Sequence, residues 1–345
     1  MKQVTTILAI LVGFTMSAQL SSVTEGVNTG QRLTGSTAAN HGDIGDEAVD
    51  LSYSNSASTT RGATGTASTA MGEGTTASGD YSTAMGESTT ASGYYSTAMG
   101  SYTNASGWYS TAMGRSTAAS GYYSTAMGYS ATASGSRSTA MGDGTDASDY
   151  ASLSIGRYNS VNSTVTAGGS ATSFDTDNAA LVIGNGTGSS TKSDAFVVYF
   201  NGNATLSGDL TINSDARLKD NIQPLGSTLN KLHQIEGKTY SLKKDEKHTP
   251  KIGVLAQEVQ AVFPELVTEG GDGILSVNYQ GLVPVLINAI NEQEVKIAAL
   301  EAQNEQLSIA SKKIATLEAQ NTEIKEMVRL LALKQSKTSS TVAAN

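Results

Sequence analysis

Ser214 and Lys219 are the residues of this sequence whose types and spacing could do chemistry. They lie in the segment TINSDARLKDNI, residues 211–222, together with Asp215 and Arg217. A serine hydroxyl becomes an effective nucleophile when a base takes its proton, and a neutral lysine can be that base. The free pKa of lysine is about 10.4, so a lysine base needs burial that lowers this pKa by a few units. On spacing alone, a polar loop with a helix-capping Ser214 fits this segment better.

The segment stands where the chain changes composition. The residues before it are mostly Gly, Ala, Ser and Thr, whereas thirteen of the fifteen lysines follow Ser214. All four prolines lie between Pro224 and Pro284. This shift predicts a boundary between two kinds of domain near residue 213.

Two further motifs follow the Ser-Lys segment in a fixed order. They read GVLAQEVQAVFPELV (253–267) and LSVNYQGLVPVLINAI (275–290). Together with SDARLKDNI they resemble the intramolecular chaperone auto-processing domain that ends phage endosialidases, tailspikes and tail fibres. The resemblance covers about residues 213–292. It implies a mixed α/β domain that assists trimer assembly and then cuts its own chain, without a cofactor.

The resemblance assigns roles within the first motif. Ser214 is the expected nucleophile and Lys219 its base. Asp215 and Arg217 are expected either to orient this pair or to form an ordinary ion pair.

Three residues of the second motif, Gly253, Gln257 and Glu258, match the family pattern. They are expected to supply oxyanion or orienting contacts, or else to serve packing. Tyr279, in the third motif, is expected in the core rather than in catalysis.

The expected cut lies beside Ser214. Attack of its hydroxyl on the Asn213 carbonyl forms a five-membered ring, as in an N-to-O acyl shift, whereas attack on its own carbonyl needs a strained four-membered ring. Geometry therefore favours the bond Asn213–Ser214. The resemblance keeps Ser214–Asp215 open, through an activated water or a neighbouring chain.

The elements before residue 161 repeat every fourteen residues, as in ASGYYSTAMGSYTN (91–104) and ASGWYSTAMGRSTA (105–118). Met recurs at the ninth place of six units, and Ile155 takes that place in a seventh. The frequent Gly excludes helix and predicts short strands with alternating side chains. Ala is expected inside a narrow core, with Tyr, Thr and Ser facing outward or lying between chains.

This pattern resembles the YadA-like head of trimeric bacterial surface adhesins over residues 63–160. The resemblance implies a left-handed parallel β-roll with three chains side by side. It also implies adhesion to an extracellular glycan or protein ligand. The repeated Tyr residues and Trp108 are expected to form a binding surface or to pack between chains.

The remaining elements complete an architecture that is mainly β with an α-helical C-terminus. Strands are expected around AALVIGNG and DAFVVYF, with a tight turn at Asn201-Gly202. Apolar residues at spacings of three and four, from Ile297 to Leu331, predict a coiled coil with a stammer, and Asn304 and Asn321 fall on its seam. The expected domains are a signal peptide (1–18), a polar N-terminal segment (19–62), the head (63–160), a β neck (161–213), the chaperone and peptidase domain (214–292), a coiled coil (293–333) and a disordered tail (334–345).

Composition narrows the functional classes. The net charge of −9 and the missing basic stripe disfavour nucleic acid and anionic membranes as partners. His41, His233 and His248 lack ligand spacing, so no metal site is expected, and the absence of Cys excludes disulfides. The apolar start of the chain, cleavable after Ala18, predicts export to the cell surface or medium, with no later transmembrane segment.

The sequence therefore favours an exported homotrimeric adhesin or fibre-like protein that cuts itself once. The alternative is a purely structural trimeric adhesin whose chaperone domain stays attached. No catalytic constellation in the head supports activity on external substrates.

Overall fold

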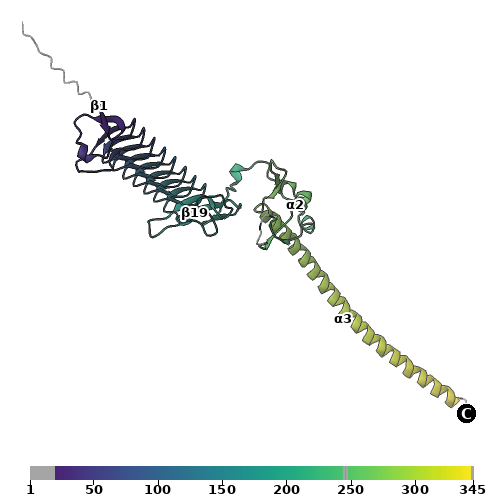
Figure 1. The fold of residues 1–345 in the computed structure, drawn as a ribbon. Helices are drawn as coiled ribbons and strands as arrows, with labels where there is room; N and C mark the ends of the chain where they lie inside the picture. The colour runs from purple at the N-terminus through teal and green to yellow at the C-terminus, as the bar shows by residue number, and fades with distance from the viewer. Residues whose placement is uncertain (1–19, 244, 246–247, 343–345) are drawn as a thin grey trace, which may run out of the picture. The chain divides into compact units, whose positions relative to one another are not determined.

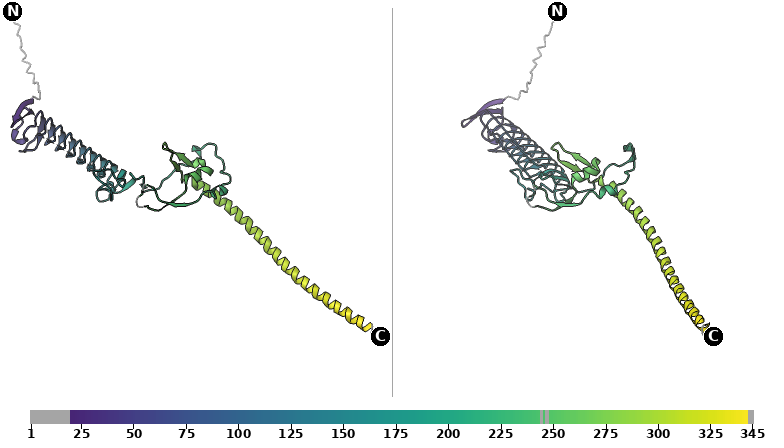
Figure 2. Two further views of the ribbon diagram at one scale, coloured as in Figure 1. Left: turned by 45° about the vertical axis from the view of Figure 1, so that its right-hand side comes forward. Right: turned by 90° about the vertical axis from the view of Figure 1, so that its right-hand side faces the viewer.

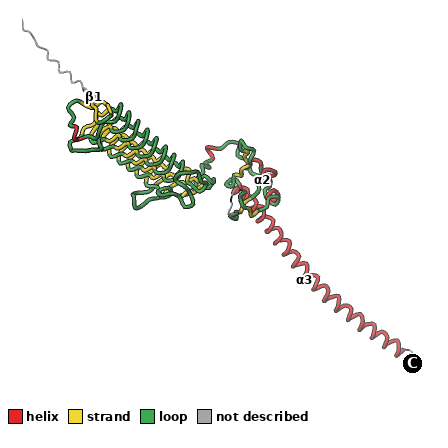
Figure 3. Tube along the Cα trace, viewed as in Figure 1, coloured by secondary structure: helices red, strands yellow, loops and turns green. Residues whose placement is uncertain are grey.

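The computed structural model describes residues 20–243, 245 and 248–342, so the expected signal peptide lies outside the described residues. The chain divides into two compact units, of which the first ends at Ile212 and the second begins at Asn213. Strands, loops and the short 3-10 helix η1 (Ala38–Asn40) build the first unit, and the second contains the long C-terminal helix (Figures 1 and 3).

The first unit contains a parallel β-solenoid, in which the chain winds through stacked turns (Figure 2). Each turn of the repeat adds one strand to a long sheet and one to a short sheet. The long sheet has the order β1 (Leu20–Glu25), β2 (Asn28–Leu33), β3 (Val49–Tyr53), β5 (Thr69–Glu73), β7 (Thr83–Glu87), β9 (Thr97–Ser101), β11 (Thr111–Arg115), β13 (Thr125–Tyr129), β15 (Thr139–Asp143), β17 (Leu153–Arg157), β18 (Ala179–Asn185), β19 (Asp194–Tyr199) and β20 (Ala204–Leu206). The short sheet contains β4 (Gly62–Ala63), β6 (Thr76–Ala77), β8 (Thr90–Ala91), β10 (Asn104–Ala105), β12 (Ala118–Ala119), β14 (Thr132–Ala133) and β16 (Asp146–Ala147).

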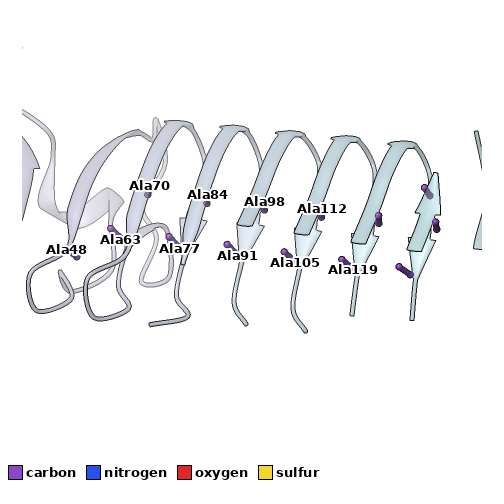
Figure 4. Packing of buried hydrophobic residues seen from close by; sticks show 14 of the residues in the cluster. Ala48, Ala63, Ala70, Ala77, Ala84, Ala91, Ala98, Ala105, Ala112 and Ala119 are labelled. Atoms are coloured by element: carbon purple, nitrogen blue, oxygen red, sulfur yellow. The ribbon is translucent and has the colours of Figure 1, made fainter. Parts of the chain in front are cut away.

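Identical residues of successive units lie above one another. Ala98 pairs with Ala84 on one side and Ala112 on the other, and the strands run parallel. Because side chains alternate along a strand, this alanine points inward and the neighbouring Met99 points outward. The inward alanines are fully buried and form two columns, one from each sheet (Figure 4). The expected narrow alanine core is confirmed.

Glycine permits the close approach of successive turns. Gly100 has a φ of 127°, and a Cβ on it would lie 1.9 Å from the carbonyl oxygen of Gly114. Both the conformation and the available space exclude a side chain at this place of the repeat.

The interior also contains hydroxyl groups. Ser96 and Thr103 are each 1% exposed, so the expectation that Ser and Thr face outward is wrong at these two places of the unit. The narrow solenoid admits only small side chains, and the small polar ones fill places that larger apolar ones cannot. Within the described residues, their hydroxyl oxygens have no hydrogen-bond partner.

The solenoid stack continues beyond the fourteen-residue repeat at both ends. Strand β3 pairs in parallel with β5, and β17 pairs in parallel with β18. Strand β18 then pairs antiparallel with β19, which forms a hairpin with β20 through the predicted turn at Asn201-Gly202. At the other end β1 and β2 form an antiparallel pair.

A buried ionic cluster holds the N-terminal end of the stack. Arg32 pairs with Glu25 at 2.8 Å and lies 3.4 Å from the Asp50 carboxylate. The same carboxylate lies 3.0 Å from Nδ1 of His41. Such a cluster closes the stack's first turn without a large apolar core.

The second unit combines short strands and helices around a small apolar core. Val259, Phe263 and Val285 form its centre. The elements are η2 (Ala216–Leu218), α1 (Leu229–Leu232), β21 (Lys238–Tyr240), β22 (Lys251–Gly253), α2 (Ala256–Val262), η3 (Pro264–Leu266), β23 (Val267–Glu269), β24 (Leu275–Val277) and α3 (Leu282–Val342). Strands β21 and β22 form one antiparallel pair, and β23 and β24 form another.

Helix α3 covers the expected coiled coil and extends beyond it at both ends. Residues 334–342 are helical, where the sequence suggested a disordered tail. Pro284 lies in the first turn of α3, where proline is tolerated, and no Gly or Pro follows it. Nothing in the sequence therefore breaks the helix before Val342. Across the described part of the chain, no helix has both the length and the apolar character needed to cross a membrane.

Candidate functional site

A short 3-10 turn brings the two ends of the Ser-Lys motif together. Ser214 precedes helix η2 (Ala216–Leu218), and Lys219 follows it. The backbone N–H of Leu218 donates to the Asp215 carbonyl at 3.1 Å, and that of Lys219 donates to the Ala216 carbonyl at 3.1 Å. The turn reverses the chain, so that Nζ of Lys219 lies 2.6 Å from Oγ of Ser214. This distance suits proton transfer between a hydroxyl and an amine.

Asp215 shapes this turn. Its carboxylate accepts a hydrogen bond from the Arg217 backbone N–H at 2.9 Å, so Asp215, rather than Ser214, caps η2. The same carboxylate accepts from the Arg217 guanidinium at 2.7 Å. Hydrogen bonds from the Arg217 side chain and backbone hold the pKa of Asp215 below its usual value. Asp215 and Arg217 thus bond to each other and fix the turn. Any effect of these two residues on Ser214 and Lys219 comes through the backbone.

The environment of the Ser-Lys pair is open to solvent in a single chain. Ser214 and Lys219 are both exposed, and so is every residue from 213 to 227. A lysine base requires burial, and a serine nucleophile requires donors for the developing oxyanion. A single chain holds Ser214 and Lys219 at contact distance, but the described residues around them provide neither burial of the lysine nor donors for an oxyanion.

Gly253 contacts the Tyr279 side chain in the core of the second unit. Gly253 ends strand β22, and a Cβ on it would lie 2.7 Å from the Tyr279 hydroxyl. That hydroxyl accepts a hydrogen bond from the Val254 backbone N–H at 3.2 Å. The absence of a side chain at Gly253 thus allows the third motif to pack against the second. Tyr279 itself is 53% exposed, so it lies at the edge of this core rather than inside it.

Glu258 joins helix α2 to strand β21. Its carboxylate accepts from the Glu236 backbone N–H at 3.0 Å and lies 3.2 Å from Nζ of Lys238. The hydrogen bond from Glu236, with a further contribution from Lys238, lowers the pKa of Glu258. Gln257 is exposed on the same helix. Among the described residues, no hydrogen bond or ion pair links Gly253, Gln257 or Glu258 to Ser214 or Lys219.

Glu292 connects the segment that follows the Ser-Lys pair to helix α3. Its carboxylate accepts from the Thr228 backbone N–H at 2.6 Å and from the Ser227 hydroxyl at 2.9 Å. Asn288, one turn earlier, donates to the Gly226 carbonyl at 2.6 Å. The hydrogen bonds that Glu292 accepts lower its pKa, with the Thr228 backbone N–H as the largest cause and the Ser227 hydroxyl as a further one. These contacts of Glu292 and Asn288 with residues 226–228, here called the Glu292 brace, were not predicted from the sequence. Their only signal in the sequence was an acidic residue in a polar part of the helix.

The histidines lie apart from the Ser-Lys pair. His41 belongs to the N-terminal ionic cluster beside Asp50, and His233 follows helix α1. Over the described ranges, no group of three His, Cys, Asp or Glu side chains is placed to hold a metal ion.

Comparison with known proteins adds independent information on both units. Residues 214–268 match a family described as chaperone of endosialidase. Residues 63–88, 91–117 and 119–145 match a family described as YadA head domain repeat.

Curated relatives include the long tail fiber protein Gp37 of Escherichia phage AR1. It is 37% identical over 97 residues, which cover 26% of this chain and 9% of the relative. A probable tail fiber protein of Escherichia phage Phieco32 is 35% identical over 96 residues, or 26% of this chain and 13% of that protein. The chain thus corresponds to a small part of each relative. Both family resemblances inferred from the motifs are confirmed: the chain carries YadA head repeats followed by a chaperone-of-endosialidase domain.

Proposed function

We propose that this chain is an exported, homotrimeric, fibre-like adhesin whose C-terminal domain guides assembly and then cuts the chain beside Ser214. The observation that carries the cutting activity is the 2.6 Å distance between Nζ of Lys219 and Oγ of Ser214. The likeness to the chaperone-of-endosialidase family supports the same reading. Export rests on the N-terminal sequence alone.

The proposed reaction conserves every atom and proton. The Ser214 hydroxyl adds to the Asn213 carbonyl while the Lys219 amine takes its proton. The amine then returns the proton to the Ser214 nitrogen as the peptide bond breaks, which leaves an ester between Asn213 and the Ser214 oxygen. Water hydrolyses this ester and releases a carboxylate at Asn213 and a free amine at Ser214. A cut at Ser214–Asp215 would instead need a water or a neighbouring chain as the nucleophile.

Trimer formation is supported by apolar surface that a single chain leaves uncovered. On the outer face of the long sheet, Met71, Met127 and Met141 are 36–38% exposed, and the same place recurs in every turn. Along α3, the apolar seam residues from Leu300 to Leu331 are more than half exposed. Rows of this length favour association with parallel copies of the same chain.

Association also offers what the Ser-Lys pair lacks. Because residues 213–227 are exposed in one chain, a neighbouring chain is the available source of burial for the lysine base and of donors for the oxyanion. We therefore expect cutting to follow assembly. The same exposure favours the structural alternative, in which the domain remains attached and uncut.

The decisive experiment compares the full chain with Ser214→Ala and Lys219→Ala on denaturing gels. Lys296→Ala, which removes an exposed lysine from α3, is the matched control. We expect two fragments from wild type and the control, and an intact chain from the other two variants. Mass spectrometry of the fragment ends distinguishes the two candidate bonds. A wild-type chain that forms folded trimers and stays intact would leave only the structural alternative.

A further inference from the structure

A group of seven aromatic side chains, six of them exposed and Tyr94 half-buried, lies along one side of the solenoid and is here called the aromatic strip. Its first column contains Tyr81, Tyr95, Tyr109 and Tyr123, whose rings stack at centroid distances of 4.7, 5.3 and 4.8 Å. Its second column contains Tyr94, Trp108 and Tyr122, with centroid distances of 5.7 and 6.5 Å. Each solenoid turn from residue 91 to residue 132 contributes one residue to each column.

The solenoid fold does not require these rings. Ala67 and Arg137 occupy the place of the first column in other turns, with φ values of 51° and 60°. Tyr95 has a φ of 54° at the same place. The backbone is thus the same with or without an aromatic residue. A bulky side chain at positive φ is an unfavourable choice for folding, so its repetition points to another use.

The contacts between the two columns are mainly edge-to-face. The faces of Tyr95 are covered by the stacked rings of Tyr81 and Tyr109, so its edge meets one face of Tyr94, at 4.4 Å and 88°. Tyr122 receives the edge of Tyr123 in the same way, at 4.3 Å and 81°. Beyond these contacts Tyr122 is 41% exposed, whereas Tyr94 is half-buried and also contacts Tyr81 and Tyr109.

Trp108 lies between Tyr94 and Tyr122. It is tilted by 49° and 45° to Tyr94 and Tyr122, so no stacking covers it, and it is 58% exposed. The second column is thus a row of three aromatic rings, of which Trp108 and Tyr122 are the most exposed. The row runs along the stacking direction, with one ring per turn.

The charges of the residues near this row limit the class of ligand that it can bind. Residues 88–114 contain no charged side chain and residues 63–160 no lysine, although Arg115 follows this segment and the Arg137 guanidinium lies over the Tyr123 ring at one end of the strip. Polyanions such as nucleic acids need Lys or Arg against their charges. Exposed hydroxyl and amide side chains occur in the same turns, including Ser92, Asn104 and Ser106. An uncharged partner rich in hydroxyl groups matches this surface.

The strip is a less suitable surface for packing against another copy of the chain. Its aromatic pairs occupy only part of the solenoid, and Asp80 and Ser136 take the second-column place on either side. The outward Met column recurs in every turn from Met71 to Met141, so it offers continuous contact between parallel chains. Copies of one chain can thus associate through the Met column and leave the strip free.

We propose that the aromatic strip binds a neutral polysaccharide chain lying along the solenoid axis. The apolar C–H faces of successive pyranose rings stack on Tyr94, Trp108 and Tyr122, while sugar hydroxyls bond to the surrounding polar side chains. The proposal deepens the adhesive role proposed for the head. It does not depend on cutting at Ser214.

Trp108 is the only tryptophan of the chain, so its fluorescence reports directly on the strip. The experiment titrates the full chain with neutral hexasaccharides of glucose, mannose, galactose and N-acetylglucosamine, and with polygalacturonate as a charged comparison. We expect a saturable fluorescence change with at least one neutral hexasaccharide and none with polygalacturonate. Calorimetry should show an at least tenfold weaker affinity for Trp108→Ala and for Tyr122→Ala.

Tyr102→Ala is the matched control, because Tyr102 is 57% exposed on a solenoid turn and also has a positive φ, of 56°, but lies outside the strip. Its affinity should equal that of wild type. Circular dichroism identifies unfolded variants, and Tyr122→Phe, which keeps the ring, should retain binding even if Tyr122→Ala does not fold.

No response to any neutral hexasaccharide would overturn the proposal. So would sedimentation showing that Trp108→Ala separates the chains, because the strip would then be a chain contact. Denaturing gels of the same samples report cutting at Ser214 separately.

Discussion

The column of buried threonines inside the solenoid allows a direct test of its energetics. Thr103 is 1% exposed, and its hydroxyl has no hydrogen-bond partner among the residues that the structure describes. Thr103→Val replaces this hydroxyl with a methyl group of nearly the same shape. An unpartnered buried hydroxyl costs about 1–3 kcal/mol, and burial of a methyl group stabilises by about 0.8 kcal/mol. We expect the free energy of unfolding to rise by about 1–2 kcal/mol per chain, allowing for imperfect fit.

Denaturant unfolding followed by circular dichroism measures this change. The midpoint should rise while the dependence on denaturant stays constant, which shows that the unfolded state has not changed. Two variants serve as controls. Thr97→Val, at a half-buried outward position of the same unit, should change stability by less than about 0.5 kcal/mol. Thr103→Ser keeps the hydroxyl and removes the methyl group, so it should destabilise by about 1 kcal/mol.

The opposite signs of the two Thr103 variants are the critical result. If Thr103→Val destabilised the protein by more than about 1 kcal/mol, the hydroxyl would be satisfied in the folded state, by its neighbours in the column or by internal water. The conclusion that these buried hydroxyls lack hydrogen-bond partners would then be refuted.

Two further predictions concern the backbone of the solenoid and the brace of the C-terminal unit. Gly100→Ala should destabilise the chain by more than about 3 kcal/mol in the same assay, because its Cβ would lie 1.9 Å from the Gly114 carbonyl oxygen at a φ of 127°. Gly208→Ala, where a Cβ meets nothing within 4 Å, should be neutral. The pKa of Glu292 is lowered from 4.5 in the folded chain, so its stabilising bond to Thr228 should be complete above that pH and lost as pH falls through the folded value. Hydrogen exchange at the Thr228 amide should show this loss in wild type, whereas Glu292→Gln should show weak protection at every pH; equal protection in the two proteins would contradict the assignment.

The sequence predicted the features that depend on local repetition. The fourteen-residue spacing of Met and the Ala-Ser-Gly and Ala-Met-Gly triplets predicted stacked short strands, because every turn must satisfy the same geometry. It did not predict the buried places of Ser96 and Thr103, since polarity alone assigned them to the surface. The interior of this solenoid is limited by volume rather than by polarity, so small hydroxyl residues are buried alongside alanine.

The candidate site was less accessible to sequence reasoning for a different physical reason. The distance between Ser214 and Lys219 follows from a local turn that Asp215 caps, so the motif itself contained that information. The brace between Glu292 and Thr228 spans sixty-four residues and has no local signal. The contacts that would bury the Ser-Lys pair do not occur within the described part of one chain.

Exposure of the Ser-Lys pair has a consequence for the order of events in assembly. A pair that became active in a monomer would cut the chain before the apolar rows of the head and of α3 were covered, and would separate the chaperone domain from an unassembled fibre. A pair that is held at contact distance but open to water avoids this outcome, because a lysine base and an oxyanion both need surroundings that water does not provide. In the function proposed above, the local turn fixes the geometry early, while the missing burial delays the reaction. The proposed nucleophile and base would then be set by the local sequence, and chain association would supply the rest of the proposed active site.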